Sequence, residues 1–517
     1  MAAIVTDQFR ILNASNFIDS VADQNNSYYV FVGLPNPTQV GFGRTSDWNT
    51  NVLDPVDNFN YANHATDTML FGKKVTLSNV KRIVRRVDWT QGTRYEMYRH
   101  DYSINSPSPV TQSSRLYDAN YYVLNADYRV YICIDNGSSG INTSGNASQD
   151  QPVFTDLEPS KAGESGDGYI WKYLFTVSPS DIIKFDSTDY ICVPNDWSNS
   201  TDAQIQAIRD NGDSSVNENQ IKKVYIERQG ENYSSGLGQV VNIVGDGTGA
   251  KVVIDVVSGK ITNAVVSSGG KGYTYGMVDL GTLNSNVIPA KSANLIPIIP
   301  PSKGHGYDLY KELGTDRILV YARFDDSTKD FPIDTKFAEI GLLKNPTSIG
   351  ATNAYIENQF SSLYALKFGT TSGSLSVGDV ISQPVSGGVA IGYVASYDTE
   401  TKVVKYIRDR SLFFNSTSLD QTDYVGVTTS AKVFNFESSS TSVTSNSGFS
   451  ASVDLNFTGI TTNPTGNKVI NLGSYFTSGV AQPEINKTSG DIIYLDNRPL
   501  ISRNSRQKED VKIILEF

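Results

Sequence analysis

The stretch that most constrains the fold of this chain is residues 166–175, with the sequence GDGYIWKYLF. A tight-turn signal, Gly-Asp-Gly, runs directly into residues that favour strands. One face of that strand carries Tyr169, Trp171, Tyr173 and Phe175, and the other carries Ile170, Lys172 and Leu174. A strand with large apolar side chains on both faces is expected to have other elements packed against each face. The stretch therefore predicts a central strand in a stacked-sheet core, and it indicates nothing about chemistry.

Composition extends this prediction to the rest of the chain. The 517 residues exceed what one ordinary core holds, so two to four domains are expected. The 29 tyrosines, 22 phenylalanines and 42 glycines favour strands and turns over helices. We therefore expect a mainly β protein with a few short helices in its loops.

Net charge, the two cysteines and the lack of a targeting signal indicate which partners and which cell compartment to expect. A net charge of −11 argues against a nucleic-acid partner, because binding to phosphates needs a basic face. Cys133 and Cys192 lie in apolar, strand-like runs, so each is expected to be a buried free thiol. The sequence shows neither a secretory signal nor an apolar run of membrane length. We therefore expect synthesis in a cytoplasm and no membrane partner.

A basic run at residues 80–89, VKRIVRRVDW, is the clearest cluster of one charge. It contains Lys81, Arg82, Arg85 and Arg86. Two interpretations compete: the cations bind an anion, or they pair with carboxylates on a solvated or subunit face. The second is favoured, because ion pairs of that kind are common on protein surfaces.

A short internal repeat begins near residue 221. Residues 221–234 are echoed forty positions later by residues 261–274, with Ile221 matching Ile261, Gly230 matching Gly270 and Tyr233 matching Tyr273. The pattern predicts a small glycine-rich β module at 221–295 whose two ends are equivalent strand-turn units. The segment between them, GDGTGAK at 245–251, lacks the Gly-Lys-Ser/Thr ending and following helix of a phosphate-binding loop, so a hairpin turn is expected there.

Residues 347–487 predict a second all-β insertion. The runs at 377–383 and 387–394 are typical of a small barrel. Residues 438–448 within it are mostly Ser and Thr, which predicts a flexible loop.

No pattern for catalysis or metal binding is present in the sequence. His64, His100 and His305 are scattered without metal-ligand spacing, and His305 between two glycines is expected to form a local hydrogen bond. The neighbouring acids Asp325 and Asp326 could serve a glycosidase only at a separation that sequence does not show. We therefore expect no catalytic residue, no metal and no cofactor.

Five stretches carry a resemblance to a known family. They are AIVTDQFR at 3–10 with Asn16 and Phe17; RRVDW at 85–89 with residues 93–95; residues 166–175 with YICVP at 190–194; residues 337–346; and residues 493–499 with the terminal IILEF at 513–517. On these, the chain resembles the baseplate wedge protein family of T-even-type contractile-tailed phages, the dimeric outer-wedge subunit. The stretches occur in the family's order and cover about half of the chain.

This resemblance implies a layered β-sandwich core with helices in peripheral loops and no catalytic residues. Residues 1–220, 296–346 and 488–517 would form that core, and 221–295 and 347–487 would be modules inserted into its loops, where long insertions cost little closure entropy. The implied function is a structural subunit of the virion's tail baseplate. It would form a homodimer, join other wedge proteins and take part in the rearrangement that triggers sheath contraction. Candidate interface or supporting-core residues are Lys81, Arg82, Arg85, Arg86, Trp89 and Arg498.

One alternative of a different class stays open. Tyrosine-rich loops and small β modules also suit carbohydrate contacts, so the chain could be a receptor- or carbohydrate-binding tail component whose inserted modules bind host glycan.

Overall fold

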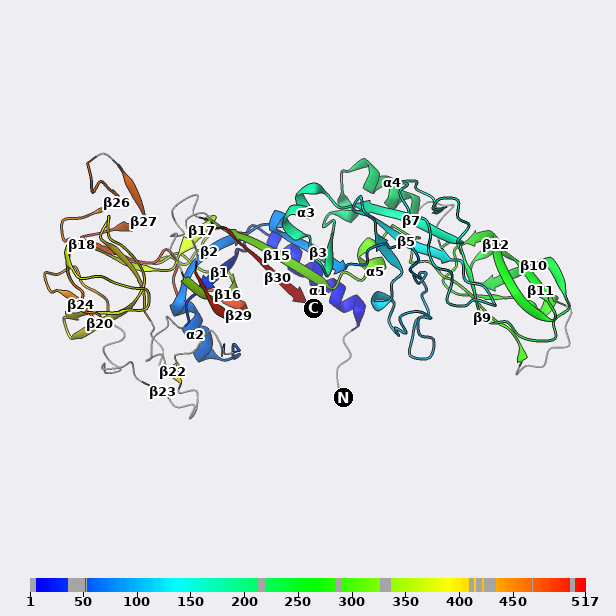
Figure 1. The fold of residues 1–517 in the computed structure, drawn as a ribbon, viewed down its shortest axis with the longest axis horizontal. Helices are drawn as coiled ribbons and strands as arrows, with labels where there is room; N and C mark the ends of the chain where they lie inside the picture. The colour runs from blue at the N-terminus through cyan, green and yellow to red at the C-terminus, as the bar shows by residue number, and fades with distance from the viewer. Residues whose placement is uncertain are drawn as a thin grey trace. The chain divides into compact units, whose positions relative to one another are not determined.

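The computed structural model describes residues 6–35, 52, 54–212, 219–283, 291–325, 336–408, 413–414, 421–422, 434–466, 468–502 and 507–517. Within them the protein is mainly β, with five α-helices of 16 residues or fewer, and this confirms the expected fold class (Figure 1). The chain forms two compact units. Unit 1 comprises Met1–Asn16, Lys81–Leu319 and Ile514–Phe517, and unit 2 comprises Phe17–Val80 and Val320–Ile513. The division into a shared core with two insertions stays a prediction.

The aromatic stretch forms β7 (Tyr169–Thr176) in unit 1. β7 lies between β5 (Arg129–Asn136) and β6 (Ser160–Lys161), and β4 (Tyr122–Leu124) completes an antiparallel sheet in the order β4-β5-β7-β6. Tyr169 and Trp171 are fully buried on one face and stack with ring centroids 5.2 Å apart, and Leu174 is fully buried on the other. Both faces of the strand are therefore covered, as its sequence predicts.

The one charged residue in β7, Lys172, is also buried. Its Nζ donates to the carbonyl oxygen of Leu157 at 2.7 Å and to Oδ1 of Asn211 at 3.1 Å. Burial lowers the pKa of Lys172 to about 8, because the charged form loses its hydration. The ammonium is held at the sheet by neutral acceptors.

Short helices flank two further strands of unit 1. β3 (Val80–Arg85) pairs antiparallel with β8 (Tyr190–Val193), from Arg82 opposite Val193 to Arg85 opposite Tyr190. α3 (Pro179–Phe185) precedes β8 and begins with a proline behind the capping side chain of Ser178. Three further helices are α1 (Asp7–Ala22), α4 (Ala203–Gly212) and α5 (Leu309–Leu313). β15 (Arg317–Phe324), which follows α5, is a neighbour of the last strand, β30 (Glu509–Glu516).

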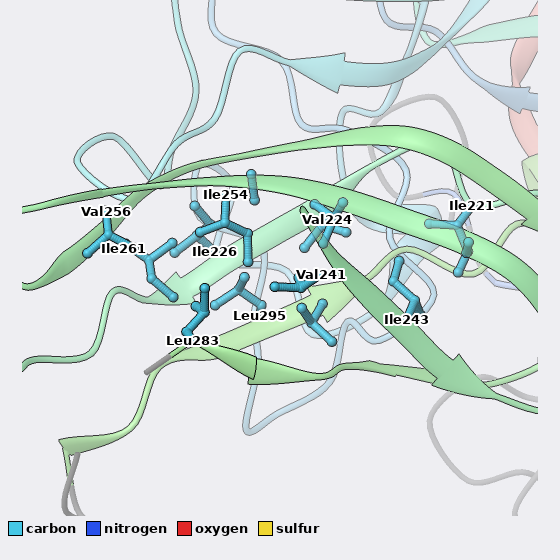
Figure 2. Close-up of a cluster of buried hydrophobic side chains, with 14 of the residues drawn as sticks. Ile221, Val224, Ile226, Val241, Ile243, Ile254, Val256, Ile261, Leu283 and Leu295 are labelled. Carbon is cyan, nitrogen blue, oxygen red and sulfur yellow. The ribbon is translucent and has the colours of Figure 1, made fainter. Parts of the chain in front are cut away.

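Residues 224–297 of unit 1 form the glycine-rich module. β9 (Val224–Arg228) pairs with β14 (Asn294–Pro297), and a four-stranded antiparallel sheet has the order β12-β11-β10-β13. Its strands are β10 (Gly236–Gly245), β11 (Thr248–Val257), β12 (Lys260–Lys271) and β13 (Gly276–Val278). β10 and β11 are consecutive paired strands, so the predicted hairpin turn is present within 245–251, at Asp246 and Gly247 between the two strands. Figure 2 shows the aliphatic cluster at the centre of the module.

The two copies of the repeat make reciprocal contacts. The Ile221 amide donates to the carbonyl of Gly269, and the Ile261 amide donates to the carbonyl of Gln229, which is the equivalent pair of positions. Gly230 and Gly270 both have positive φ, 68° and 61°, and a Cβ at either would lie 2.5 Å from a backbone atom. Each half therefore closes its turn on the other, and the repeat is a structural pseudo-two-fold.

Unit 2 contains a five-stranded antiparallel sheet in the order β17-β2-β1-β16-β29. Its strands are β17 (Gln359–Ser361), β2 (Met69–Val75), β1 (Tyr28–Gly33), β16 (Lys336–Lys344) and β29 (Asp491–Ser502), and α2 (Phe59–Thr68) directly precedes β2. Every residue of the central strand β1 is buried.

A closed barrel forms in unit 2, within the segment 347–487 that the sequence predicts to be all-β. The order is β21-β20-β19-β24-β25-β18-β28, and a β21–β18 pairing closes six of these strands into a ring, with β28 paired to β18 outside it. The bounds are β18 (Tyr364–Ser372), β19 (Val380–Val385), β20 (Gly388–Asp398), β21 (Val403–Ile407), β24 (Val443–Ser445), β25 (Ser450–Val453) and β28 (Val480–Ala481). Two small pairs, β22 (Phe413–Phe414) with β23 (Gln421–Thr422) and β26 (Gly459–Thr462) with β27 (Ile470–Phe476), accompany it. The small-barrel prediction is confirmed.

The prediction of a flexible loop at 438–448 is wrong in its centre. β24 lies there and pairs with both β19 and β25. Val443 is fully buried while Thr444 points outward and is exposed. β-branched residues suit a half-buried pleated surface, and this preference outweighs the polar composition of the segment.

The two cysteines are buried free thiols, as expected. Burial raises the pKa of Cys192 to about 12 and raises the pKa of Cys133 well above its usual value. Both thiols are therefore held in the unreactive protonated form.

Candidate functional site

Two cations of the basic run pair with carboxylates around α3. Lys81 Nζ lies 3.0 Å from Asp181 Oδ2, within that helix. Arg86 Nη1 lies 2.7 Å from Oδ1 of Asp186, the residue after it, and Arg86 Nε reaches both oxygens of Asp88 at 3.0 Å. The Asp88 hydrogen bond raises the pKa of Arg86. For these two residues the structure has the carboxylate pairing that was favoured over an anion site.

The other two cations of the run have different surroundings. Arg82 is 4% exposed, and its guanidinium lies over the ring of Tyr310, 4.0 Å from the centroid. Arg85, three residues further along β3, projects from the opposite face of the strand. Its Nη2 donates to the carbonyl oxygens of Asp118 and Ala119, at 3.1 and 2.9 Å. Arg82 is a core residue, and Arg85 ties β3 to the loop before β4.

Arg85 also lines a cleft of about 480 Å³ in unit 1. Arg86, Arg115 and Arg317 line it with Arg85, and the acids on its wall are Asp118, Asp189 and Asp316. Arg115 Nη2 lies 3.1 Å from Asp316 Oδ2, and Arg317 Nη1 lies 3.4 Å from Asp316 Oδ1. The cleft is therefore a polar depression in which most cations already have an anionic neighbour, which suits a protein interface better than binding of a free anion.

Trp89 and Arg498 complete the predicted set, and the structure does not bring them together with the basic run. Trp89 is partly buried in unit 1, where its Nε1 donates to Oγ of Ser148 at 3.0 Å. Arg498 belongs to β29 of unit 2, is 56% exposed in its side chain and lies 2.5 Å from Asp496. Trp89 supports local structure, whereas Arg498 forms an exposed ion pair with Asp496.

The three histidines have structural surroundings. His305 Nδ1 lies 2.6 Å from Glu312 Oε1, and the amide of Gly306 donates to the second oxygen of that carboxylate at 2.7 Å. His100 accepts from the amide of Ile299, and burial lowers the pKa of His100. His64 contacts the carbonyl of Pro35. The local hydrogen bond expected of His305 is present, with a buried partner that the sequence did not indicate.

The described part of the chain contains no arrangement of residues that indicates a metal site or a pair of catalytic carboxylates. No group of three or more His, Cys, Asp or Glu there could hold a metal ion. Asp326, half of the neighbouring acid pair, lies outside the described residues. None of the described helices is long and apolar enough to cross a membrane.

Sequence reasoning missed two surfaces. The cleft depends on Arg115 and Arg317, which are far from the basic run along the chain, and no spacing rule links them. The second is the outward face of the module's four-stranded sheet, where aliphatic side chains are exposed. A signal for it was present, because residues 239–244, QVVNIV, place apolar residues at both parities of the strand.

Part of the chain is similar to a known phage protein. The chain is similar to the baseplate wedge protein gp8 of Enterobacteria phage T4, with 26% identity over 216 residues. The matched region is 37% of this chain and 60% of that protein, so the chain spans less than two thirds of its relative's length. No protein-family model matches the chain.

Proposed function

We propose that this chain is a structural subunit of a phage tail baseplate, located in the virion and made in the cytoplasm of the host. The observation that carries the proposal is the similarity to a baseplate wedge protein over 216 residues. The mainly β fold and the structural surroundings of all three histidines support a role in assembly rather than catalysis.

The finer proposal is that the subunit forms a homodimer, joins neighbouring wedge proteins and takes part in the rearrangement that triggers sheath contraction. A surface that changes partner during such a transition is best built from polar contacts that can be exchanged. The cleft beside Arg85 and Arg86 has that character, and the exposed pair of Arg498 and Asp496 is a second contact of the same kind. Arg82, Lys81 and Trp89 would hold the structure behind such an interface.

A genetic and structural experiment tests the role. In the virus that encodes the chain, a nonsense mutation in its gene should give particles with incomplete baseplates. Complementation with a tagged copy should restore them and place the tag at the baseplate in electron micrographs. Intact, contractile tails assembled without the chain would contradict the proposal.

One observation favours the alternative of carbohydrate binding. A depression of about 500 Å³ in unit 2 is lined by Tyr475, Ile460, Ile349 and Pro483, and Tyr475 is 62% exposed. Among the described tyrosines only Tyr275 and Tyr475 are more than half exposed, so tyrosine-rich exposed loops are not general. Glycan-array binding by the full chain that Tyr475→Ala abolishes would favour this function, and the absence of binding would remove it.

A further inference from the structure

The outward face of the module's four-stranded sheet is apolar and exposed. Its inward face packs in the aliphatic cluster of Figure 2, with Val241 2% exposed and Val252 fully buried. On the opposite face Val240, Val244, Val265 and Met277 are exposed by 59, 55, 55 and 68%. Exposed apolar side chains gathered on one face of a sheet commonly mark a protein contact.

Strand register shows how this face is laid out. Val240, Val253 and Val265 are opposite one another on β10, β11 and β12, so they form one row across the sheet. Two residues to one side along β11 lies Lys251, and two residues to the other side lies Asp255. Each is about 7 Å from Val253 along the strand and on the same face.

The polar rows continue onto the neighbouring strands. Lys251 is opposite Asn242 and Ser268, and Asp255 is opposite Asn263. Asp255 accepts hydrogen bonds from the amide of Gly238 at 2.9 Å and from Nδ2 of Asn263 at 3.3 Å. The valine row therefore lies between two polar rows that carry opposite charges, and Val244 and Met277 lie beyond the row of Lys251.

We propose that this face docks on the same face of a second copy of the chain. A two-fold axis lying between two such sheets, along the valine row, reverses the strand direction of one copy relative to the other. Valines then meet valines, and Lys251 of each copy lies over Asp255 of its partner, twice in the pair. An isologous contact requires this self-complementarity, in which residue i meets j and j meets i.

Charge selects this axis over the other face-to-face arrangement. A two-fold axis parallel to the strands and through β11 would place Lys251 over Lys251 and Asp255 over Asp255. Like charges opposite each other across an interface strongly oppose association. The aligned packing of two sheets, with a crossing angle near −30° and a spacing of about 10 Å, leaves long side chains such as Lys251 within reach of their partners.

This inference rests on the proposed function in one respect, since it names the surface through which an assembling subunit would contact itself. The test uses the full chain and measures the dissociation constant of self-association by sedimentation equilibrium. Lys251→Glu and Asp255→Lys each place like charges opposite each other twice. Each should weaken self-association by about a hundredfold or more.

The double variant Lys251→Glu/Asp255→Lys should restore association, because the opposite charges meet again with their signs exchanged. Lys291→Glu is the matched control: it breaks the exposed pair with Glu231 on the same module and should leave the constant unchanged. Asp255→Asn, which keeps an acceptor for Gly238, should weaken association less than Asp255→Lys. Circular dichroism checks that each variant is folded.

Three results would overturn the inference. The wild-type chain could be monomeric, the single reversals could leave association intact, or the double variant could fail to recover when both singles are weakened. The last result would indicate a different protein on this face. A monomeric chain that is nevertheless found in baseplates would sink the inference and leave the proposed function standing.

Discussion

Two sheets of unit 1 have apolar residues on both faces, and they differ in what covers them. In the sheet of β7, Trp171 is fully buried on one face and Leu174 on the other. In the module, Val241 is buried while the adjacent Val240 is 59% exposed. The first sheet has used both faces to make a core. The second has used one, and the other remains available for a contact with another chain.

Apolar residues on both faces of a strand therefore predict that both faces are covered, but they do not predict which chain supplies the cover. β7 carries large aromatic side chains, and other residues of the same chain bury both of its faces. The module's sheet is aliphatic, and the described residues of its chain leave the outer face open.

The largest effect is expected in β7. Trp171→Ala removes a fully buried ring that stacks on Tyr169 and lies edge-on to Tyr95, so unfolding should become easier by about 3–5 kcal/mol. Chemical denaturation followed by circular dichroism measures it. A loss below about 1 kcal/mol would mean that β7 is not the closed core that the comparison assumes.

The second effect concerns Lys172 and depends on pH. Its pKa falls from 10.5 in the unfolded chain to about 8 in the folded one, so between these values the unfolded chain binds more protons. Stability should therefore rise with pH across that window, by on the order of 3 kcal/mol in total. Below about pH 8 Lys172 is charged in both the folded and the unfolded chain, so the buried charge destabilises the fold by its full amount.

The measurement for Lys172 is the difference in unfolding free energy between wild type and Lys172→Met at several pH values from 7 to 9.5. Other groups that titrate in this range contribute equally to both chains and cancel. The difference should shift in favour of the wild type as pH rises. A flat difference would contradict the lowered pKa.

A matched pair on β10 tests the two faces of the module directly. Val241→Ala should destabilise the protein by roughly 2 kcal/mol, because it removes two buried methyl groups and leaves a cavity. Val240→Ala changes an exposed side chain of the same strand and should cost within about 0.5 kcal/mol beyond strand propensity. Thermal unfolding at concentrations where the chain is monomeric compares them. Equal losses of stability in the two variants would contradict the assignment of one buried and one exposed face to this sheet.

The smallest effect is expected at the ion pairs beside β3. Arg86→Gln removes the contacts with Asp88 and Asp186, both partly solvated, and should cost about 0.5–1 kcal/mol at low salt. Salt should reduce the difference, because solvent-exposed charges are screened. Unfolding at 50 mM and 500 mM NaCl measures it, and a loss that salt leaves unchanged would point to a packing role instead.

The elements predicted from sequence are those whose evidence is local. The alternation in β7, the hairpin at 245–251 and the barrel strands each depend on a few consecutive residues, and the structure has all three. The segment around Val443 failed because composition was weighed above the alternation of buried and exposed positions. A strand of three residues between turns gives little periodicity to detect.

The candidate site was predictable only in part for the same reason. The clustered positive charges in the sequence identified the run that contains Lys81 and Arg86. The sequence also favoured the pairing of these cations with carboxylates, which the structure has. The acids that pair with these cations and the arginines across the cleft come from distant segments, so only folding identifies them. The role of these residues as an interface stays a proposal.

The pairing of β9 with β14 has a consequence for how such a protein changes over generations. The chain leaves for the module and returns from it at one place, through a short antiparallel ladder with Tyr225 opposite Ile296. A segment whose two ends already lie together can be gained or lost as a cassette, because the remaining chain needs only a short turn to rejoin. Residues 229–293 can therefore be lost or replaced without rebuilding the rest of the protein, because the two ends of the segment already lie side by side.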